Sequence, residues 1–175
     1  MTAGPEADVS VRVAWAADAP SIVAIQHEAW TAAWPGAVGV PGVDALVDQW
    51  ARIIEGPPDA RIRVLVALER ATVRGVALVH PCHDPDTDQL ADAEIGEFLV
   101  APAHRGAGHG SRLLQACVDT LRADHFSRAV WWVGATDDAT RAFAVSAGWG
   151  PDGGHRELAE ESGTTVKQVR LHTAL

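Results

Sequence analysis

The spacing of apolar residues changes abruptly at Gly56-Pro57-Pro58. Before that break, residues 43–55 repeat apolar side chains every three or four positions, which predicts an amphipathic helix. After it, residues 61–69 (RIRVLVALE) and 72–80 (TVRGVALVH) alternate with a period of two. That alternation predicts two antiparallel strands joined by a tight turn at Arg70-Ala71. The change of period favours a fold that mixes helices with a sheet.

Further segments follow the same two patterns. Strands are predicted at 9–16, 92–100, 128–134, 154–159 and 165–172, and helices at 18–34, 108–123 and 137–147. Asp18 is expected to cap the first helix, because its carboxylate can accept from free helical N–H groups and Pro20 follows just inside. The 175 residues suit one domain over 1–175, with residues 1–8 as a disordered tail. The predicted architecture is an α/β (α+β) fold, a mixed central sheet of about seven strands with helices on both faces.

Composition narrows the functional classes. The formal net charge of -9 argues against a nucleic-acid partner, because that role needs a basic surface. No apolar run approaches the roughly 18 residues that span a bilayer, and no secretory signal is recognisable. Cys82 and Cys117 have no metal-ligand spacing, and Cys117 shares a helical face with leucines, which predicts a packing role. We therefore expect a cytoplasmic protein with no membrane partner and no bound metal.

Residues 100–112 (VAPAHRGAGHGSR) are the most informative stretch, because a predicted strand ends there, a glycine-rich turn follows and a helix begins. Glycine permits positive φ and close approach of a ligand, so consecutive N–H groups can point into one site. The start of a helix adds unpaired donors and a partial positive charge. Four basic side chains lie in the same turn: His104, Arg105, His109 and Arg112. The turn therefore suits an anionic, phosphate-bearing ligand.

Two common phosphate-binding loops do not match this turn. A Walker loop ends in Gly-Lys-Ser/Thr, whereas this stretch has Gly110-Ser111-Arg112 and lacks the lysine. A dinucleotide-binding loop has G-x-G-x-x-G directly after its strand. Here the pattern is G-x-G-x-G, and five residues separate it from the strand end. The missing lysine and the different glycine spacing therefore exclude both loop types.

The turn resembles the pyrophosphate-binding motif of the GNAT superfamily of N-acetyltransferases, Arg/Gln-x-x-Gly-x-Gly/Ala, at Arg105, Gly108 and Gly110. Two other segments extend the resemblance. Residues 93–100 (AEIGEFLV) look like the family's fourth strand. Residues 137–149 (DDATRAFAVSAGW) are similar to its later helix, Asn-x-x-Ala-x-x-Phe-Tyr followed by Gly-Phe. The order of elements also matches along nearly the whole chain.

This resemblance implies acetyl-CoA as the co-substrate and suggests how it is held. The pyrophosphate would lie on backbone N–H groups of the turn, and the pantetheine arm would pair with the end of the strand 92–100. The N–H of Val100 would stabilise the oxyanion that forms from the thioester carbonyl. Arg105 or Arg112 would reach the 3′-phosphate. The implied cofactor-binding residues are Phe98, Leu99, Val100, Arg105, Gly106, Ala107, Gly108, His109, Gly110, Ser111 and Asp137.

Glu94 is the candidate general base. It shares strand parity with Val100, so it faces the side on which the thioester is expected, and an amine must lose a proton before it attacks. The alternative, that Glu94 is an ordinary carboxylate on a strand face, stays open. Glu97 has the opposite parity and is the weaker choice. His80 and His83 are left open as residues that line the acceptor side.

One position departs from the family pattern. Where the family usually has a tyrosine that protonates the leaving thiolate, this chain has Ala144, and it contains no tyrosine. The expected function is transfer of an acetyl group from acetyl-CoA to an amine, by direct attack. The acceptor, a small molecule or a peptide, is not identified, and neither is the oligomeric state, monomer or homodimer. The missing tyrosine favours one alternative, a non-catalytic acyl-CoA-binding protein of the same fold.

Overall fold

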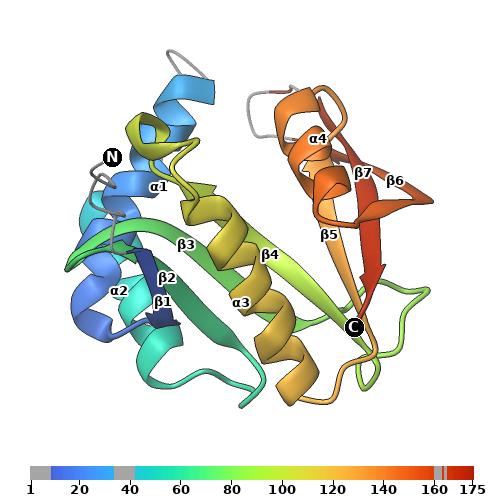
Figure 1. Ribbon diagram of the computed structural model, residues 1–175, viewed down its shortest axis with the longest axis horizontal. Coiled ribbons are helices and arrows are strands. Elements are labelled where there is room, and N and C mark those ends of the chain that lie inside the picture. The colour runs from blue at the N-terminus through green and yellow to red at the C-terminus, as the bar shows by residue number, and fades with distance from the viewer. Residues whose placement is uncertain (1–8, 34–41, 160–162, 164) are drawn as a thin grey trace, which may run out of the picture. The chain divides into compact units, whose positions relative to one another are not determined.

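The computed structural model describes residues 9–33, 42–159, 163 and 165–175 (Figure 1). The predicted tail, residues 1–8, lies outside the described residues. Within them, seven strands form a mixed sheet of order β1-β2-β3-β4-β5-β7-β6, which confirms the predicted architecture. The strands are β1 (Val9–Val13), β2 (Arg63–Glu69), β3 (Thr72–Pro81), β4 (Asp92–Val100), β5 (Arg128–Gly134), β6 (Gly150–Ala159) and β7 (Thr165–Ala174). The α-helices are α1 (Ala19–Ala33), α2 (Val43–Glu55), α3 (His109–Ala123) and α4 (Asp138–Ser146).

The chain divides into two compact units, Met1–Val79 with Glu97–Cys117 and His80–Gly96 with Val118–Leu175. In the first unit, β1 pairs antiparallel with β2, and β2 pairs antiparallel with β3. The predicted hairpin turn is present, and Arg70 within it adopts a positive φ of 55°. Strand β4 gives its first part to the second unit and its last part to the first.

Helices cover both faces of β2 and β3 in the first unit. Val64, Val66 and Leu68 of β2 pack with α1 and α2 in one apolar core. The opposite face meets α3, because a β-carbon built on Gly75 would lie 3.4 Å from Leu113 Cδ2. Alternate residues of β2 therefore pack against helices on opposite faces of the sheet, which is why consecutive residues of this strand are buried.

The second unit contains the parallel pairing in the sheet. Residues 92–95 of β4 pair with residues 128–131 of β5, and β5 pairs antiparallel with β7, which pairs antiparallel with β6. Trp131 of β5 packs edge-on against Trp149, with ring centroids 6.0 Å apart. Both tryptophans are buried, so they act as core residues of this unit.

Asp18 plays a different part from the predicted helix cap. Strand β1 ends at Val13, earlier than expected, and a short 3-10 helix, η1 (Ala16–Asp18), precedes α1. The Asp18 carboxylate accepts from the backbone N–H of Trp15 at 2.7 Å and pairs with Arg12 at 2.7 Å. This local network turns the chain into α1, and the alternation of residues 9–16 gave no sign of it.

Two other expectations concern the cysteines and membrane-spanning segments. Cys82 and Cys117 are both buried free thiols, and burial raises the pKa of Cys117 to about 12, so its predicted packing role is confirmed. Among the described residues, no helix is long and apolar enough to cross a membrane.

Candidate functional site

The predicted anion-binding turn lies in the first unit. After β4, Ala101 N–H donates to the Arg74 carbonyl at 2.8 Å, and a short 3-10 helix, η2 (Pro102–His104), leads into the glycine segment. Gly106 and Gly108 adopt φ of 77° and 88°, the left-handed region that glycine tolerates best. A β-carbon on either glycine would meet nothing within 4 Å. The turn is therefore open to solvent where a ligand would approach its backbone.

Helix α3 begins directly after this turn. The helix begins at His109. Its first turn is closed by a hydrogen bond that Arg112 N–H donates to the Gly108 carbonyl at 3.2 Å. The N–H groups that precede Arg112 belong to the end of the helix that lacks intrahelical acceptors. This end carries partial positive charge, so the backbone from Gly106 to Ser111 offers donors suited to an anion.

The four basic side chains of the turn separate in the structure. Arg105 is exposed, so it is free to reach an anion in solvent. Arg112 donates to the Val9 carbonyl of β1 at 3.2 Å, which favours Arg105 over Arg112 as a phosphate contact. His104 and His109 turn toward Glu69 at the end of β2. Only the backbone of His109 is therefore available for the predicted cofactor contact.

The end of β4 supplies the predicted pantetheine edge and a half-buried carboxyl group, Glu97. Phe98, Leu99 and Val100 are half-buried. Glu97 accepts from Gln26 Nε2 at 3.4 Å, and Gln26 Oε1 accepts in turn from Trp50 Nε1 at 3.1 Å. Burial raises the pKa of Glu97 above its ordinary value, and this outweighs the hydrogen bond from Gln26.

Glu94 belongs to the second unit, where it forms a cluster with Cys82 and Asp84. The Cys82 thiol donates to Glu94 Oε2 at 3.8 Å. Burial raises the pKa of Glu94 above its ordinary value. A carboxyl group whose pKa is moved toward neutrality is better matched to proton transfer near pH 7 than an exposed one.

His80 lies on the same face of β4 as Glu94. Its Nε2 atom lies 2.6 Å from where a β-carbon of Gly96 would stand, and alternate residues of a strand face the same side. Its Nδ1 atom lies 2.7 Å from the Pro81 carbonyl oxygen. Because a carbonyl only accepts, Nδ1 carries the hydrogen, and Nε2 of the neutral ring keeps its lone pair. The sequence left the role of His80 open. The signal that could have placed it is Gly96, two positions after Glu94, because a glycine in a strand leaves room for a neighbouring side chain.

A buried arginine holds the acidic loop that follows His83. Arg170 of β7 pairs with Asp84 at 2.9 Å and with Asp152 at 2.8 Å, and it also contacts Asp86. The Arg170 guanidinium lowers the pKa of Asp86 to about 2. Trp132 Nε1 donates to Asp84 at 3.0 Å. Asp84 is therefore held in place beside Glu94.

Two positions of helix α4 bear on the family pattern. Asp137 is the N-cap of α4, and its Oδ1 atom accepts from Thr140 N–H at 3.0 Å. Helix capping accounts for this aspartate, and its predicted cofactor contact stays a prediction. Ala144 is completely buried at 0% exposure. A side chain larger than alanine has no open space at that position.

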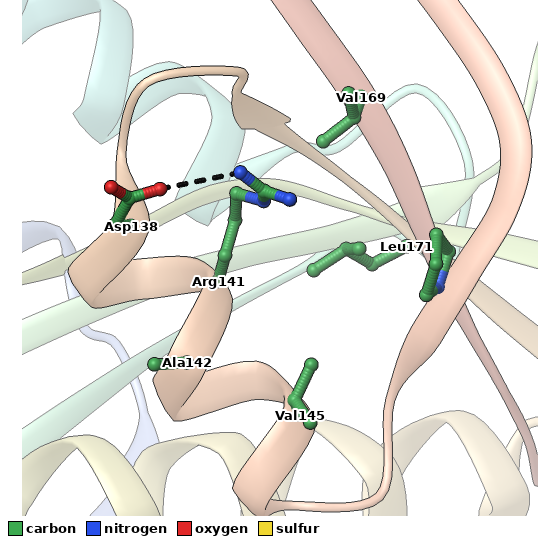
Figure 2. A pocket seen from close by; sticks show the side chains of 7 residues that line it. Asp138, Arg141, Ala142, Val145, Val169 and Leu171 are labelled. Atoms are coloured by element: carbon green, nitrogen blue, oxygen red, sulfur yellow. Dashed lines mark hydrogen bonds and ion pairs between the residues drawn. The ribbon is translucent and has the colours of Figure 1, made fainter.

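A shallow pocket lies between α4 and the last two strands (Figure 2). Arg141 reaches toward Asp138 with a 3.3 Å contact at one end, and Val145, Val169 and Leu171 supply an apolar surface. None of the predicted site residues lines it. We assign it no part in the chemistry.

The comparison with family models gives one match over most of the chain. Residues 21–149 match the acetyltransferase (GNAT) family. The mycothiol acetyltransferase of Kineococcus radiotolerans is 36% identical over 91 residues, which cover 52% of this chain and 28% of that protein. The chain thus spans well under two thirds of the length of that curated relative.

Solved structures agree in fold. A GCN5-related N-acetyltransferase from Kribbella flavida is 26% identical, with a TM-score of 0.73 over 98% of this chain and 100% of the other. A Salmonella typhimurium protein with its cofactor acetyl-CoA is 21% identical, with a TM-score of 0.72 over 95% of this chain and 94% of the other. The ribosomal-protein-alanine N-acetyltransferase of Brucella melitensis is 22% identical, with a TM-score of 0.74 over 95% and 99%. The last two show the fold alone.

Proposed function

The chain belongs to the acetyltransferase (GNAT) family, and from that premise we propose that it transfers an acetyl group from acetyl-CoA to an amine. The observation that carries the proposal is the open turn from Arg105 to Ser111, where two glycines of positive φ lead into the start of α3. The Salmonella typhimurium neighbour, which was solved with acetyl-CoA, supports the identity of the donor.

The turn fits the anionic part of acetyl-CoA. A diphosphate needs several N–H donors and room to approach the backbone, and the glycines at 106 and 108 provide that room. Exposed Arg105 adds a cation at the same place. The N–H of Val100 would donate to the thioester carbonyl oxygen as negative charge develops there. Phe98 and Leu99 would pair with the pantetheine arm.

Glu94 and His80 are the groups that would take the proton from the acceptor. The amine lone pair forms the new C–N bond at the carbonyl carbon, and the proton it loses passes to the Glu94 carboxylate or to Nε2 of His80. The C–S bond then breaks and coenzyme A leaves as a thiolate. A thiol with an ordinary pKa of about 8.5 is a fair leaving group, so the reaction does not depend on an acid at Ala144.

The acceptor is an amine, in a small molecule or a peptide. The curated relative is named for acetylation of mycothiol, but it matches only part of this chain, so the acceptor is not transferred from it. A cytoplasmic location and the single-domain organisation stay predictions of the sequence, and the oligomeric state, monomer or homodimer, stays open.

The buried alanine at position 144 favours one second candidate, a protein that binds acyl-CoA without turning it over. Two measurements on the purified protein separate the candidates: calorimetric titration with acetyl-CoA, and release of free thiol with a panel of small amines and peptides. Binding together with thiol release supports the transferase. Binding without release from any amine supports the second candidate, and absence of binding overturns both.

A further inference from the structure

Three potential metal ligands converge in the first unit behind the glycine turn. Glu69 is the last residue of β2, His104 ends η2 and His109 begins α3. One carboxylate oxygen and one ring nitrogen from each histidine all lie within 4.8 Å of one another. The two imidazole rings meet edge-on, with centroids 6.4 Å apart. Glu69 is remote in sequence from the two histidines, and the hairpin after β2 and the turn after β4 bring the three together.

The side chain of His109 is a buried polar group of this cluster. It is 1% exposed, and both of its ring nitrogens are buried without a hydrogen-bond partner among the described residues. A buried polar group without a partner is costly, and native structures contain few of them. Position 109 is the first residue of α3, where an apolar side chain would fill the same space at no such cost.

Glu69 has only part of its bonding capacity filled. Its Oε2 atom contacts Arg74 Nε at 3.2 Å and His104 Nδ1 at 3.9 Å. Arg74 would compete with an ion for this carboxylate, and it approaches the same oxygen as His104. A carboxylate has two oxygens and about four lone-pair sites, so it can hold Arg74 and still bind an ion.

We propose that Glu69, His104 and His109 bind a divalent transition-metal ion with the ligand preferences of zinc. Two imidazoles and a carboxylate are a typical zinc donor set, and a water completes the tetrahedron. Zn–N distances of about 2.1 Å place tetrahedral ligand atoms about 3.4 Å apart. The present spacing, within 4.8 Å, therefore has to close by little more than about 1 Å on binding. Imidazole donors disfavour Mg²⁺ and Ca²⁺, which take oxygen ligands.

The second cluster of possible ligands, around Glu94, is a poorer metal site. Asp84 there is already held by Arg170 and by Trp132. Burial raises the pKa of the Cys82 thiol, which opposes the thiolate form that binds metals. Of the two clusters, the one at Glu69 is therefore the better candidate for a metal site.

An ion at this position would also stabilise the conformation of the glycine turn. His104 and His109 flank residues 105–108, so one ion bound to both would fix the two ends of the glycine segment. On the proposed function, this segment holds the pyrophosphate of acetyl-CoA, and the ion would act as a structural support of the substrate site. Metal binding itself does not depend on that function, and it is measured without acetyl-CoA.

The test uses the full chain without an affinity tag, stripped with a chelator. Zn²⁺ is titrated by calorimetry, and Co²⁺ is added separately for its visible absorption. We expect one ion per chain, tetrahedral Co²⁺ bands, and a higher melting temperature with Zn²⁺, because an ion that binds only the folded state stabilises it. Mg²⁺ should give none of these effects.

His104→Gln and His109→Leu should each weaken Zn²⁺ binding at least about tenfold to 100-fold, since even outer-sphere partners of a metal contribute that much. Metal-free His109→Leu should melt no lower than wild type, which shows that the variant folds. The controls are His27→Gln and His155→Gln, which remove exposed histidines, and they should bind Zn²⁺ as wild type does. No uptake by wild type, or equal affinity in wild type and both ligand variants, would overturn the proposal.

Discussion

The Nε2 atom of His80 lies 2.6 Å from the position that a β-carbon would occupy on Gly96. Real β-carbons do not approach another atom so closely, so His80 can hold this position only because residue 96 is glycine. The ring thereby stands on the face of β4 that Glu94 shares. Nδ1 is anchored at the Pro81 carbonyl, which leaves Nε2 as the acceptor. A small residue in a strand thus determines where a potential base stands.

Gly96→Ala should displace His80 without removing any functional group. If Glu94 and His80 act together in proton transfer, we expect the turnover number to fall about 10²-fold, the usual contribution of a positioned base. Steady-state thiol release measures this, with acetyl-CoA affinity as a second readout that should not change. Gly150→Ala is the control, because a β-carbon there meets nothing within 4 Å. Unchanged turnover in Gly96→Ala would remove His80 from the proton path.

Glu94→Gln should bind acetyl-CoA as wild type does but lose about 10² or more in turnover at neutral pH. A carboxylate base works only when ionised. Because burial raises the pKa of Glu94, wild-type activity should begin to fall at a pH above the ordinary carboxyl range as the solution is acidified. The variant should lack this limb, and its deficit should shrink as pH rises and the amine deprotonates unaided.

The pH–rate profile of Glu97→Gln is the matched control for that experiment. Glu97 lies on the same strand, and burial likewise raises its pKa, but it has the opposite parity and bonds to Gln26. We expect its profile to keep the acid limb of wild type. If instead Glu97→Gln loses the limb and Glu94→Gln keeps it, the base is Glu97.

Gly108→Val should abolish measurable acetyl-CoA binding. A β-branched residue disfavours the φ of 88° at this position and places methyl groups where the pyrophosphate would approach. Gly153→Val separates strain from ligand contact, because Gly153 has the same φ of 88° but lies in β6. Both variants should lose about 1–2 kcal/mol of stability, and only Gly108→Val should lose binding in a calorimetric titration. Equal affinity in Gly108→Val and wild type would refute the pyrophosphate assignment.

Local patterns were enough to predict most of the fold. The alternation of residues 61–69 and 72–80 and the turn between them correspond to β2 and β3 within two residues. The Gly-rich turn before α3 was predicted for the same reason, since its conformation depends on glycines adjacent in sequence. β6 starts at Gly150, four residues earlier than predicted, because its glycines and proline conceal a strand that pairing with β7 stabilises.

The parts of the site that depend on distant residues could not be predicted. His109 was expected to face the anion with its neighbours, but its side chain turns to Glu69, forty residues earlier in the sequence. Asp84 is likewise held by Arg170 of the last strand, 86 residues later in the sequence. Neither contact leaves a periodic signal, because each requires knowing which strands are neighbours.

Arg170→Met should destabilise the fold by about 3 kcal/mol at pH 7, because it leaves the carboxylates of Asp84 and Asp152 partly buried with a lost counter-charge. The pKa values of Asp86 and Asp152 are lowered in the folded protein, so these two carboxylates favour folding while they are ionised. Since Arg170 holds the pKa of Asp86 at about 2, the difference from wild type should narrow only as pH falls from about 4 toward 2. Urea unfolding at a series of pH values measures both the loss of stability at pH 7 and its decrease with falling pH. Lys167→Met, which removes an exposed cation from the same strand, should cost less than about 1 kcal/mol.

Ala144→Tyr would restore the hydroxyl that the family pattern has at this position, and from sequence alone we would expect it to raise turnover if the pocket had room. The structure gives it none, because Ala144 is 0% exposed and the turn that follows closes onto its carbonyl through Trp149 N–H at 3.0 Å. Overpacking a filled core costs about 1–3 kcal/mol or more. We therefore expect a lower melting temperature and no gain in thiol release. Val145→Tyr is the control, since Val145 is 56% exposed and can accept the ring at little cost. A faster, equally stable Ala144→Tyr enzyme would show that this position opens toward the thioester after all.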